Sequence, residues 1–340
     1  MDRRTFLKSS AILGGSTLVS ACLGATPAAM PAPPPTLPPS ATVPVAFVKT
    51  TDRAQGVKQA LALLELSGLK GKNLFLKPNF NSADVAPGST HTDTLSTLIK
   101  ELNALGAARL TVGDRSGMGN TRQVMEQKEI FRMASELGFD ALVFDELAEA
   151  DWEQHSPAGG HWQRGFALPR PVLAADGIVQ TCCLKTHRYG GHFTLSLKNS
   201  VGLAAKYVPG TDYNFMNELH SSPNQRRMIA EINAAYSPDL IVLDGVEAFV
   251  DGGPDRGKLV QANVILAGFD RVAIDAVGVA ILRYFGTTPA VSQGKIFEQE
   301  QIARAVELEL GVNNPRSIEL ITADPDSAAY AKQIEGVLTL

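Results

Sequence analysis

The chain has 340 residues, a formal net charge of −4 and three cysteines. It contains no basic run that could follow a phosphate backbone, which argues against nucleic acid as a partner. Three cysteines cannot supply the four thiolates of a zinc site or an iron–sulfur cluster within one chain, so no iron–sulfur cluster is expected.

The N-terminal residues are typical of a bacterial export signal. Residues 2–8 contain the two adjacent arginines of a twin-arginine signal, and residues 11–21 form an apolar run too short to span a bilayer. Residues 19–22 resemble a lipobox, in which Cys22 is acylated and becomes the first residue of the mature protein. The alternative is ordinary cleavage after Ala21 with an incidental cysteine. The twin-arginine route carries folded proteins, often after a cofactor or metal has been loaded.

These features predict where the protein works and how it is attached. We expect residues 1–21 to be removed after passage through the twin-arginine export machinery, which leaves 28 basic and 34 acidic side chains. Residues 22–43, rich in Pro and Ala, would form a lipid anchor and tether up to about 60 Å long. The protein would then be a cell-envelope lipoprotein, on the periplasmic side of a bacterial membrane or on the cell surface.

The rest of the chain, residues 44–340, alternates short β-branched and apolar runs with amphipathic segments. This alternation predicts a single α/β domain with a mostly parallel, Rossmann-like sheet flanked by helices. The expected strands are residues 45–48, 73–76, 109–112, 141–144, 177–181, 240–243, 263–266 and 318–321. The expected helices are residues 53–66, 92–105, 121–137, 222–235, 271–285 and 295–310. Residues 146–176 break the rhythm and predict an insertion or a small antiparallel excursion.

Four polar segments directly follow predicted strands: residues 77–81, 113–119, 185–187 and 244–247. In open α/β sheets, ligands bind outside the carboxyl ends of the strands, so these segments are expected to share one edge. Lys77, Asn79 and Asp114 are candidate substrate-binding residues on this ground. The glycines of residues 113–119 would let backbone amides approach an anion, or they simply form a turn with a helix cap.

Residues 185–199 are the densest stretch of candidate chemistry. His187 and His192 could meet at one centre, as metal ligands or as an acid/base pair, with Lys185 as a third catalytic candidate. Lys198 and Asn199 are candidate substrate-binding residues, because a lysine can neutralise a carboxylate or phosphate. The alternative is two ordinary surface histidines with solvated lysines.

Acidic residues and cysteines elsewhere add further candidates. Asp244 and Glu247 could hold a divalent metal or orient a base. Asp275 lies in an apolar helical pattern, so it is expected to orient a lysine or histidine or to cap a neighbouring loop. Cys182 and Cys183 are adjacent, so a disulfide between them would be strained. This favours their interpretation as small buried hydrophobic side chains over a redox pair.

The order of three motifs resembles a known family. The motifs are Lys-Pro-Asn at residues 77–79, Lys-x-His at 185–187 followed by Thr-Leu-Ser-Leu-Lys-Asn-Ser-Val-Gly at 194–202, and Asp244 leading to Gly-Pro-x-x-Gly at 253–257. Together they resemble the uncharacterised family called domain of unknown function 362, over roughly residues 44–325. The resemblance implies a fold and a shared site but no reaction. Members often carry ferredoxin modules, whose cysteines this chain lacks, and many have a lysine where this chain has Cys183.

Three functions are compatible with the sequence. The favoured one is an enzyme acting on a small carboxylate or phosphate substrate by hydrolysis or isomerisation, with or without a divalent metal, because no dinucleotide fingerprint with its distal acid is present. A lipid-anchored module that binds a solute without catalysis is the alternative. A redox protein that uses Cys182 and Cys183 is the least favoured, because the two cysteines are not in a Cys-x-x-Cys arrangement.

Overall fold

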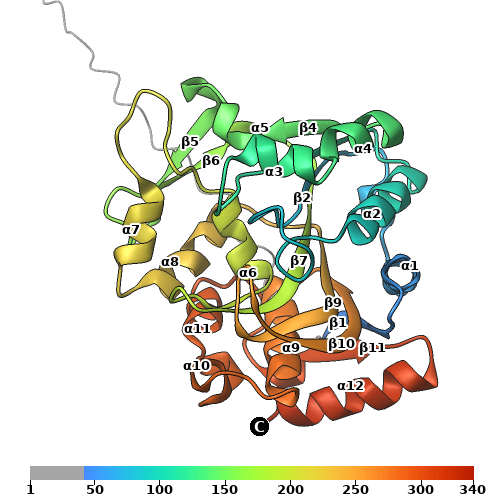
Figure 1. The fold of residues 1–340 in the computed structure, drawn as a ribbon. Coiled ribbons are helices and arrows are strands. Elements are labelled where there is room, and N and C mark those ends of the chain that lie inside the picture. The colour runs from blue at the N-terminus through green and yellow to red at the C-terminus, as the bar shows by residue number, and fades with distance from the viewer. Residues whose placement is uncertain (1–41) are drawn as a thin grey trace, which may run out of the picture. The chain divides into compact units, whose positions relative to one another are not determined.

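A nine-stranded sheet runs through residues 42–340, which are the residues that the computed structural model describes (Figure 1). Eight of its strands lie side by side in the order β11-β1-β10-β9-β7-β2-β3-β4, and β8 pairs with the end of β7. The strands are β1 (Val43–Lys49), β2 (Asn73–Lys77), β3 (Arg109–Asp114), β4 (Asp140–Val143), β7 (Gly177–His187), β8 (His192–Thr194), β9 (Leu240–Gly252), β10 (Gly257–Gly268) and β11 (Ile318–Ile321). The expectations for residues 1–41, including Cys22, lie outside the described residues.

The pairing of these strands is mostly parallel, which confirms the predicted α/β class. The antiparallel pairs are those of β10 with β1 and β9, and of β7 with β8. The neighbours β9, β7, β2, β3 and β4 are parallel throughout. Their carboxyl ends therefore point to the same edge of the sheet, as the strand rule requires.

Helices cover both faces of the sheet (Figure 1). They are α1 (Arg53–Ala62), α2 (Thr92–Ala104), α3 (Thr121–Gln127), α4 (Ile130–Leu137), α5 (Arg170–Leu173), α6 (Ser196–Asn199), α7 (Phe215–Ser221), α8 (Gln225–Ile232), α9 (Arg271–Tyr284), α10 (Pro289–Ser292), α11 (Glu300–Glu307) and α12 (Pro325–Leu338). Consecutive residues of β1 show the division of the core. Phe47 packs in a cluster with side chains of α9 and α12, and Val48 packs in a cluster with α1 and α2. A strand buried on both faces in this way reads as a continuous apolar run.

Residues 146–176 form the predicted antiparallel excursion. β5 (Trp152–His155) and β6 (Phe166–Pro169) pair as a separate two-stranded antiparallel sheet. Trp152, Trp162 and Phe166 pack with side chains of α8 in a third apolar cluster. All of residues 42–340 belong to one compact unit. Within that range, none of the helices combines the length and apolar character that crossing a membrane requires.

Several element boundaries differ from the sequence-based prediction. The helix predicted over residues 121–137 is divided into α3 and α4, because Glu129 has a left-handed backbone with φ of 56°. Residues 295–310 contain the shorter α11, preceded by a 3₁₀ turn. The largest difference concerns β7 and β9, which continue well past the predicted ends at residues 181 and 243. Residues 185–187 are therefore part of a strand rather than a loop.

Candidate functional site

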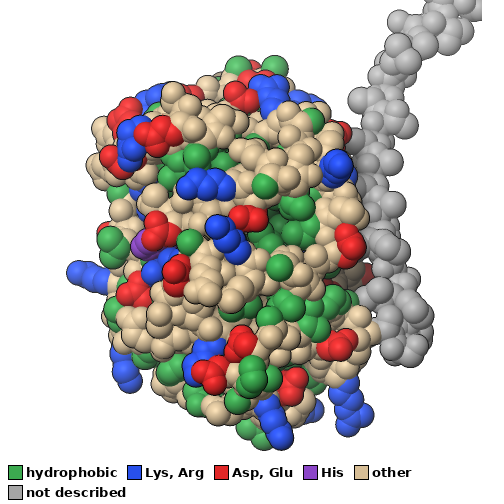
Figure 2. Space-filling model, turned by 90° about the vertical axis from the view of Figure 1, so that its right-hand side faces the viewer, with side chains coloured by type: hydrophobic (Ala, Val, Ile, Leu, Met, Phe, Trp, Pro, Cys, Tyr) green, Lys and Arg blue, Asp and Glu red, His purple; other side chains and the backbone are tan. Residues whose placement is uncertain are grey.

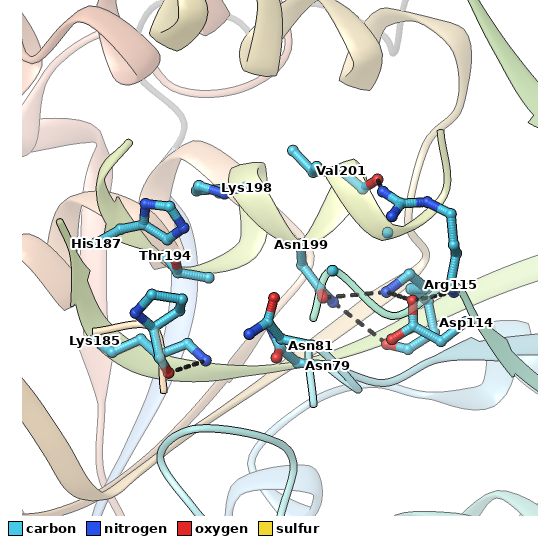
Figure 3. Close-up of a pocket in the computed structure, with 14 residues that line it drawn as sticks. Asn79, Asn81, Asp114, Arg115, Lys185, His187, Thr194, Lys198, Asn199 and Val201 are labelled. Carbon is cyan, nitrogen blue, oxygen red and sulfur yellow. Dashed lines mark hydrogen bonds and ion pairs between the residues drawn. The ribbon is translucent and has the colours of Figure 1, made fainter. Parts of the chain in front are cut away.

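A small cavity lies where the carboxyl ends of β2, β3 and β7 meet α6 (Figure 3). Its volume is about 50 Å³. The residues that line it are Lys77, Asn79, Asn81, Asp114, Arg115, Gly117, Lys185, His187, Thr194, Lys198, Asn199, Val201, Gly202 and Pro254. The structure thus brings together seven of the residues singled out from sequence. They come from segments up to 122 positions apart in the chain, such as Lys77 and Asn199.

A buried ion pair forms the floor of the cavity. Leu76 of β2 pairs with Val112 of β3, so the polar residues at the two strand ends become neighbours. Lys77 Nζ lies 2.8 Å from Asp114 Oδ1, and both residues are 1% exposed. The Asp114 carboxylate also accepts hydrogen bonds from the backbone amides of Phe80 and Arg115, each at 2.7 Å. Burial raises the pKa of Asp114, and these three donors oppose that effect by stabilising the ionised form.

Lys77 makes two further hydrogen bonds and is fully used by the protein. Its ammonium group donates to the Pro78 carbonyl at 2.7 Å and to Asn199 Oδ1 at 3.3 Å. Burial lowers the pKa of Lys77, while the neighbouring Asp114 raises it. Since the pair carries one charge of each sign, it adds no net charge to the cavity.

Two other cationic side chains are held by neutral carbonyl groups. Lys185 is fully buried and donates to the carbonyls of Gly88 and Pro254, and burial lowers its pKa. The Arg115 guanidinium donates to three carbonyls, those of Ala204, Ser116 and Val201. Within residues 42–340, neither side chain forms an ion pair. Carboxylates act on both groups only from beyond ion-pair distance, Asp145 and Asp114 on Arg115 and Asp84 and Asp255 on Lys185.

Lys198 is the third cation without a counter-ion. It lies on α6 and is 7% exposed, and its amine has no hydrogen-bond or ion-pair partner in the described part of the chain (Figure 3). Burial lowers the pKa of Lys198 to about 7, and the nearby charges of Lys185 and Arg115 act in the same direction. Positive neighbours favour the neutral amine because they repel an additional proton.

The position of Lys198 depends on Asp275. The carboxylate of this α9 residue accepts hydrogen bonds from the Ser196 amide at 2.7 Å and the Leu197 amide at 3.1 Å. These are the first amides of α6, so Asp275 caps the short helix that carries Lys198. Of the two roles that the sequence left open for Asp275, capping is therefore the one observed.

His187 faces the cavity beside Lys198. Its Nδ1 atom is buried and has no hydrogen-bond partner in the described residues. Burial lowers the pKa of His187 well below its ordinary value, and the charges of Lys198 and Lys185 lower it further. Both side chains pack against Gly191, which leaves room for them because it has no side chain. A methyl group built there would lie 2.5 Å from Lys198 Cε and 3.1 Å from His187 Nδ1. The imidazole is therefore neutral at pH 7, and its Nδ1 atom lies near the Lys198 side chain.

Four buried polar atoms around this cavity lack partners in the described chain. They are Asn79 Oδ1, Asn81 Nδ2, His187 Nδ1 and Thr194 Oγ1. Buried polar groups are nearly always hydrogen-bonded in native proteins, and each unpaired group costs about 1–3 kcal/mol. Their concentration at one cavity indicates a site built for a polar ligand.

The structure does not bring His192 into the cavity. It is opposite His187 in the register of β7 and β8, but it has a left-handed backbone with φ of 63° and does not line the cavity. Burial lowers the pKa of His192, and the neighbouring charge of Arg226 lowers it further. The structure therefore places His187 at this cavity and His192 outside its lining, and a joint role of the two imidazoles stays a prediction.

Asp244 and Glu247 are also placed elsewhere, because β9 continues through them. Asp244 Oδ2 accepts from Arg53 Nε at 2.9 Å and from Thr94 Oγ1 at 2.6 Å. The same arginine lies 2.9 Å from Glu247 Oε2. Both carboxylates are thus paired with a cation near the start of α1, away from the cavity. Residues 42–340 contain no group of three or more His, Cys, Asp or Glu side chains that could hold a metal ion.

Some cavity residues were not assigned a role from the sequence. Asn81 and Arg115 lie inside the polar segments quoted above, so their strand-end positions were an available signal. Thr194 and Pro254 lie in motifs that carried the family resemblance.

Cys182 and Cys183 are buried and free, and burial raises the pKa of both thiols, in agreement with the expected apolar role.

Comparison with known families places the cavity in a shared domain. The model of the family described as "Domain of unknown function (DUF362)" matches residues 74–280, which is more than half of the chain. The chain belongs to the DUF362 family. The matched DUF362 region contains every residue that lines the cavity. This confirms the resemblance that the motifs suggested.

This DUF362 protein is similar to a curated protein in sequence and to a solved structure in fold. The chain is 24% identical to thylakoid-associated protein sll1697 of Synechocystis sp. (strain ATCC 27184 / PCC 6803 / Kazusa) over 257 residues, which are 73% of this chain and 74% of that protein. The lactate racemase apoprotein of Thermoanaerobacterium thermosaccharolyticum superposes with a TM-score of 0.42 and 15% identity, over 88% of each chain.

Proposed function

We propose that the protein is an enzyme that binds a small carboxylate or phosphate substrate in this cavity and catalyses an isomerisation or hydrolysis through proton transfer. The observation that carries the proposal is a coincidence of two features at one place. Three cationic side chains that form no ion pair within residues 42–340 line the same cavity as four buried polar atoms that have no hydrogen-bond partner in that range. Elsewhere, on the face that Figure 2 displays, Lys and Arg are interspersed with Asp and Glu.

The charge of the cavity favours an anion. A buried charge is costly unless it is paired, and Lys185, Arg115 and Lys198 have no ionic partner within the described residues. An anionic group would compensate this charge and accept hydrogen bonds from Lys198 and Asn81. The volume of about 50 Å³ is several times the 10–15 Å³ that one water needs, so it suits a carboxylate or phosphate group rather than a large ligand.

Two groups in the cavity are suited to proton transfer. The neutral His187 imidazole can accept a proton at Nδ1, where no protein group competes for the lone pair. Lys198, whose pKa is about 7, can both gain and lose a proton near neutral pH. Catalytic acids and bases work best when their pKa lies near the working pH, a condition that Lys198 meets. The lowered pKa of His187 keeps its imidazole neutral, so it can take up a proton only transiently.

Binding can be tested with a substitution that changes shape but not charge. In Gly191→Ala the new methyl group would clash with Lys198 Cε, so we expect the affinity for carboxylates and phosphate to fall by at least about tenfold. Isothermal titration calorimetry with acetate, pyruvate and phosphate would measure this loss. Gly336→Ala is the matched control, because Gly336 lies on α12 with nothing within 4 Å of the added methyl.

The outcomes separate the candidate functions. Failure of the wild-type protein to bind any of these anions, or equal affinity in Gly191→Ala, would contradict the proposal. Binding without turnover of any substrate would favour the alternative of a solute-binding module.

The pH dependence of anion binding gives a further prediction. A bound anion raises the pKa of Lys198 above its unliganded value of about 7, so sulfate binds more tightly when the amine is protonated than when it is neutral. Sulfate affinity should therefore be constant below pH 7 and fall as the pH rises above it. Titrations from pH 5.5 to 9 would check this, since sulfate itself does not titrate in that range. A sulfate affinity independent of pH would contradict a role for Lys198 in binding.

We also propose that the mature protein is attached to a membrane outside the cytoplasm by lipid on Cys22. The twin-arginine pair and the lipobox-like residues 19–22 support this. Replacing Cys22 with alanine should move the protein from the membrane fraction to the soluble exported fraction. Replacing Arg3 and Arg4 with lysine should leave it in the cytoplasm. A Cys22→Ala protein that remains in the membrane fraction would contradict the lipid anchor.

A further inference from the structure

Three buried lysines line the cavity, and they differ in what their amines contact. Lys77 has Asp114, Asn199 and a carbonyl as acceptors, and Lys185 has two carbonyls. The Lys198 amine contacts none of the hydrogen-bonding groups in the described chain. Protonated lysines held by acceptors are poor nucleophiles, because their lone pair is occupied. Lys198 alone of the three has an amine that is unengaged and directed at the ligand site.

The surroundings of Lys198 favour the neutral, nucleophilic form. Lys185 and Arg115 add positive charge nearby, and burial removes the water that would solvate an ammonium ion. A lysine desolvated beside other cationic groups is one of the arrangements that activates an amine for covalent catalysis. Next to it, His187 Nδ1 has no partner and can receive a proton.

We propose that Lys198 forms a Schiff base with the carbonyl carbon of a 2-oxo acid bound in the cavity. This inference rests on the proposed function and names its substrate class. The carboxylate of such an acid would be attracted by the positive charges of Lys185 and Arg115. It would accept hydrogen bonds from Asn81 Nδ2 and Thr194 Oγ1. The carbonyl group beside the carboxylate supplies the electrophile that a simple carboxylate or phosphate lacks.

The chemistry balances without an oxidant or reductant. The Lys198 nitrogen adds to the carbonyl carbon, and the C–N bond forms as the C=O π bond breaks. His187 carries one proton from the new ammonium group to the alkoxide oxygen, which gives a carbinolamine. It then carries the second nitrogen proton to the hydroxyl group, so the C–O bond breaks, water leaves and the nitrogen lone pair forms the C=N bond. The product is an imine, C=N, on Lys198. A protonated imine withdraws electrons from the adjacent carbon and makes its C–H bond more acidic, which would serve an isomerisation by proton transfer.

Reductive trapping tests this assignment directly. The wild-type protein would be incubated with pyruvate and sodium borohydride, digested, and mapped by mass spectrometry. We expect the reduced pyruvyl adduct on Lys198 and not on Lys77 or Lys185. The initial rate of trapping by cyanoborohydride should rise as the pH increases through 7, because the neutral amine reacts. Lys198→Arg should remove the adduct while keeping a cation, and Lys206→Arg, which alters an exposed lysine, should not.

Calorimetry on the same samples separates this inference from the proposed function. Pyruvate that binds in the cavity without any adduct on Lys198 would overturn the Schiff base and leave anion binding intact. A protein that neither binds pyruvate nor forms the adduct would overturn both. Adducts spread over exposed lysines at the level of Lys198 would show a non-selective reaction and would also overturn the assignment.

Discussion

Replacing Asp114 with alanine should lower the free energy of unfolding by about 3–5 kcal/mol, because it leaves the Lys77 ammonium buried without its ionic partner. The substitution also removes the acceptor of the Phe80 and Arg115 amides, so the loop that follows β2 and the turn that follows β3 lose a shared anchor. Equilibrium denaturation in urea at pH 7 would measure the change.

A second variant distinguishes loss of the pair from loss of one partner. Replacing both residues with apolar ones of similar size, as in Lys77→Met with Asp114→Leu, should cost less than Asp114→Ala alone, because no uncompensated charge remains. The exposed pair of Arg132 and Glu136 is the matched surface control, and Glu136→Ala should have little effect. An Asp114→Ala protein as stable as the wild type would contradict the buried ion pair.

Replacing Lys198 with methionine should have two opposite effects, a gain in stability and a loss of anion binding. Methionine has a similar shape but no charge to desolvate. Because the pKa of Lys198 falls from 10.5 to about 7 in the folded protein, we expect the free energy of unfolding to rise by roughly 2–4 kcal/mol below pH 7. Affinity for small carboxylates should fall by about 10- to 100-fold, the loss expected for a charge-assisted hydrogen bond.

The pH dependence of this stability gain identifies its cause. Below pH 7 Lys198 is protonated in both the folded and the unfolded state, so the folded wild type bears the full free-energy cost of burying the ammonium group. As the pH rises from 7 towards 10.5, the unfolded chain still binds the proton and the folded protein does not, so the wild type gains stability relative to the variant. Urea denaturation of both proteins from pH 6 to 9.5 would show whether the gap narrows. A gap that widens, or a variant less stable than the wild type at pH 6, would contradict an unpaired Lys198. Lys206→Met, at an exposed position, is the control and should not show the effect.

Such a combination is typical of a residue that costs stability and is kept for function. Lys77 and Lys185 are buried as deeply as Lys198, but the protein supplies acceptors for both. Buried cations alone therefore do not mark the site. The difference between satisfied and unsatisfied lysines is visible only when the contacts are known.

Sequence reasoning located much of the site because the topology is simple. β2, β3 and β7 are parallel neighbours, so the polar residues that end them, Lys77, Asp114 and Lys185, were expected at one edge and are found there. Lys198 and Asn199 were found because they lie in a dense polar segment that leads into α6.

The same reasoning failed where strand length mattered. Hydrophobic periodicity marks the middle of a buried strand but not its end. β9 is 13 residues long and runs through Asp244 and Glu247. The partner of both, Arg53, is 191 positions from Asp244 and gave no local signal. The place of His192 outside the cavity lining also had no local signal, since its left-handed backbone at the start of β8 depends on geometry that the sequence did not indicate.

The central claim is that the cavity formed by β2, β3, β7 and α6 binds a small anion. Crystals soaked in selenate, with anomalous data collected at the selenium edge, would test it most directly. We predict an anomalous peak between Lys198, His187 and Asn81 that is lost in Lys198→Met crystals. Selenate found only at surface sites, with the cavity holding water alone, would contradict the account.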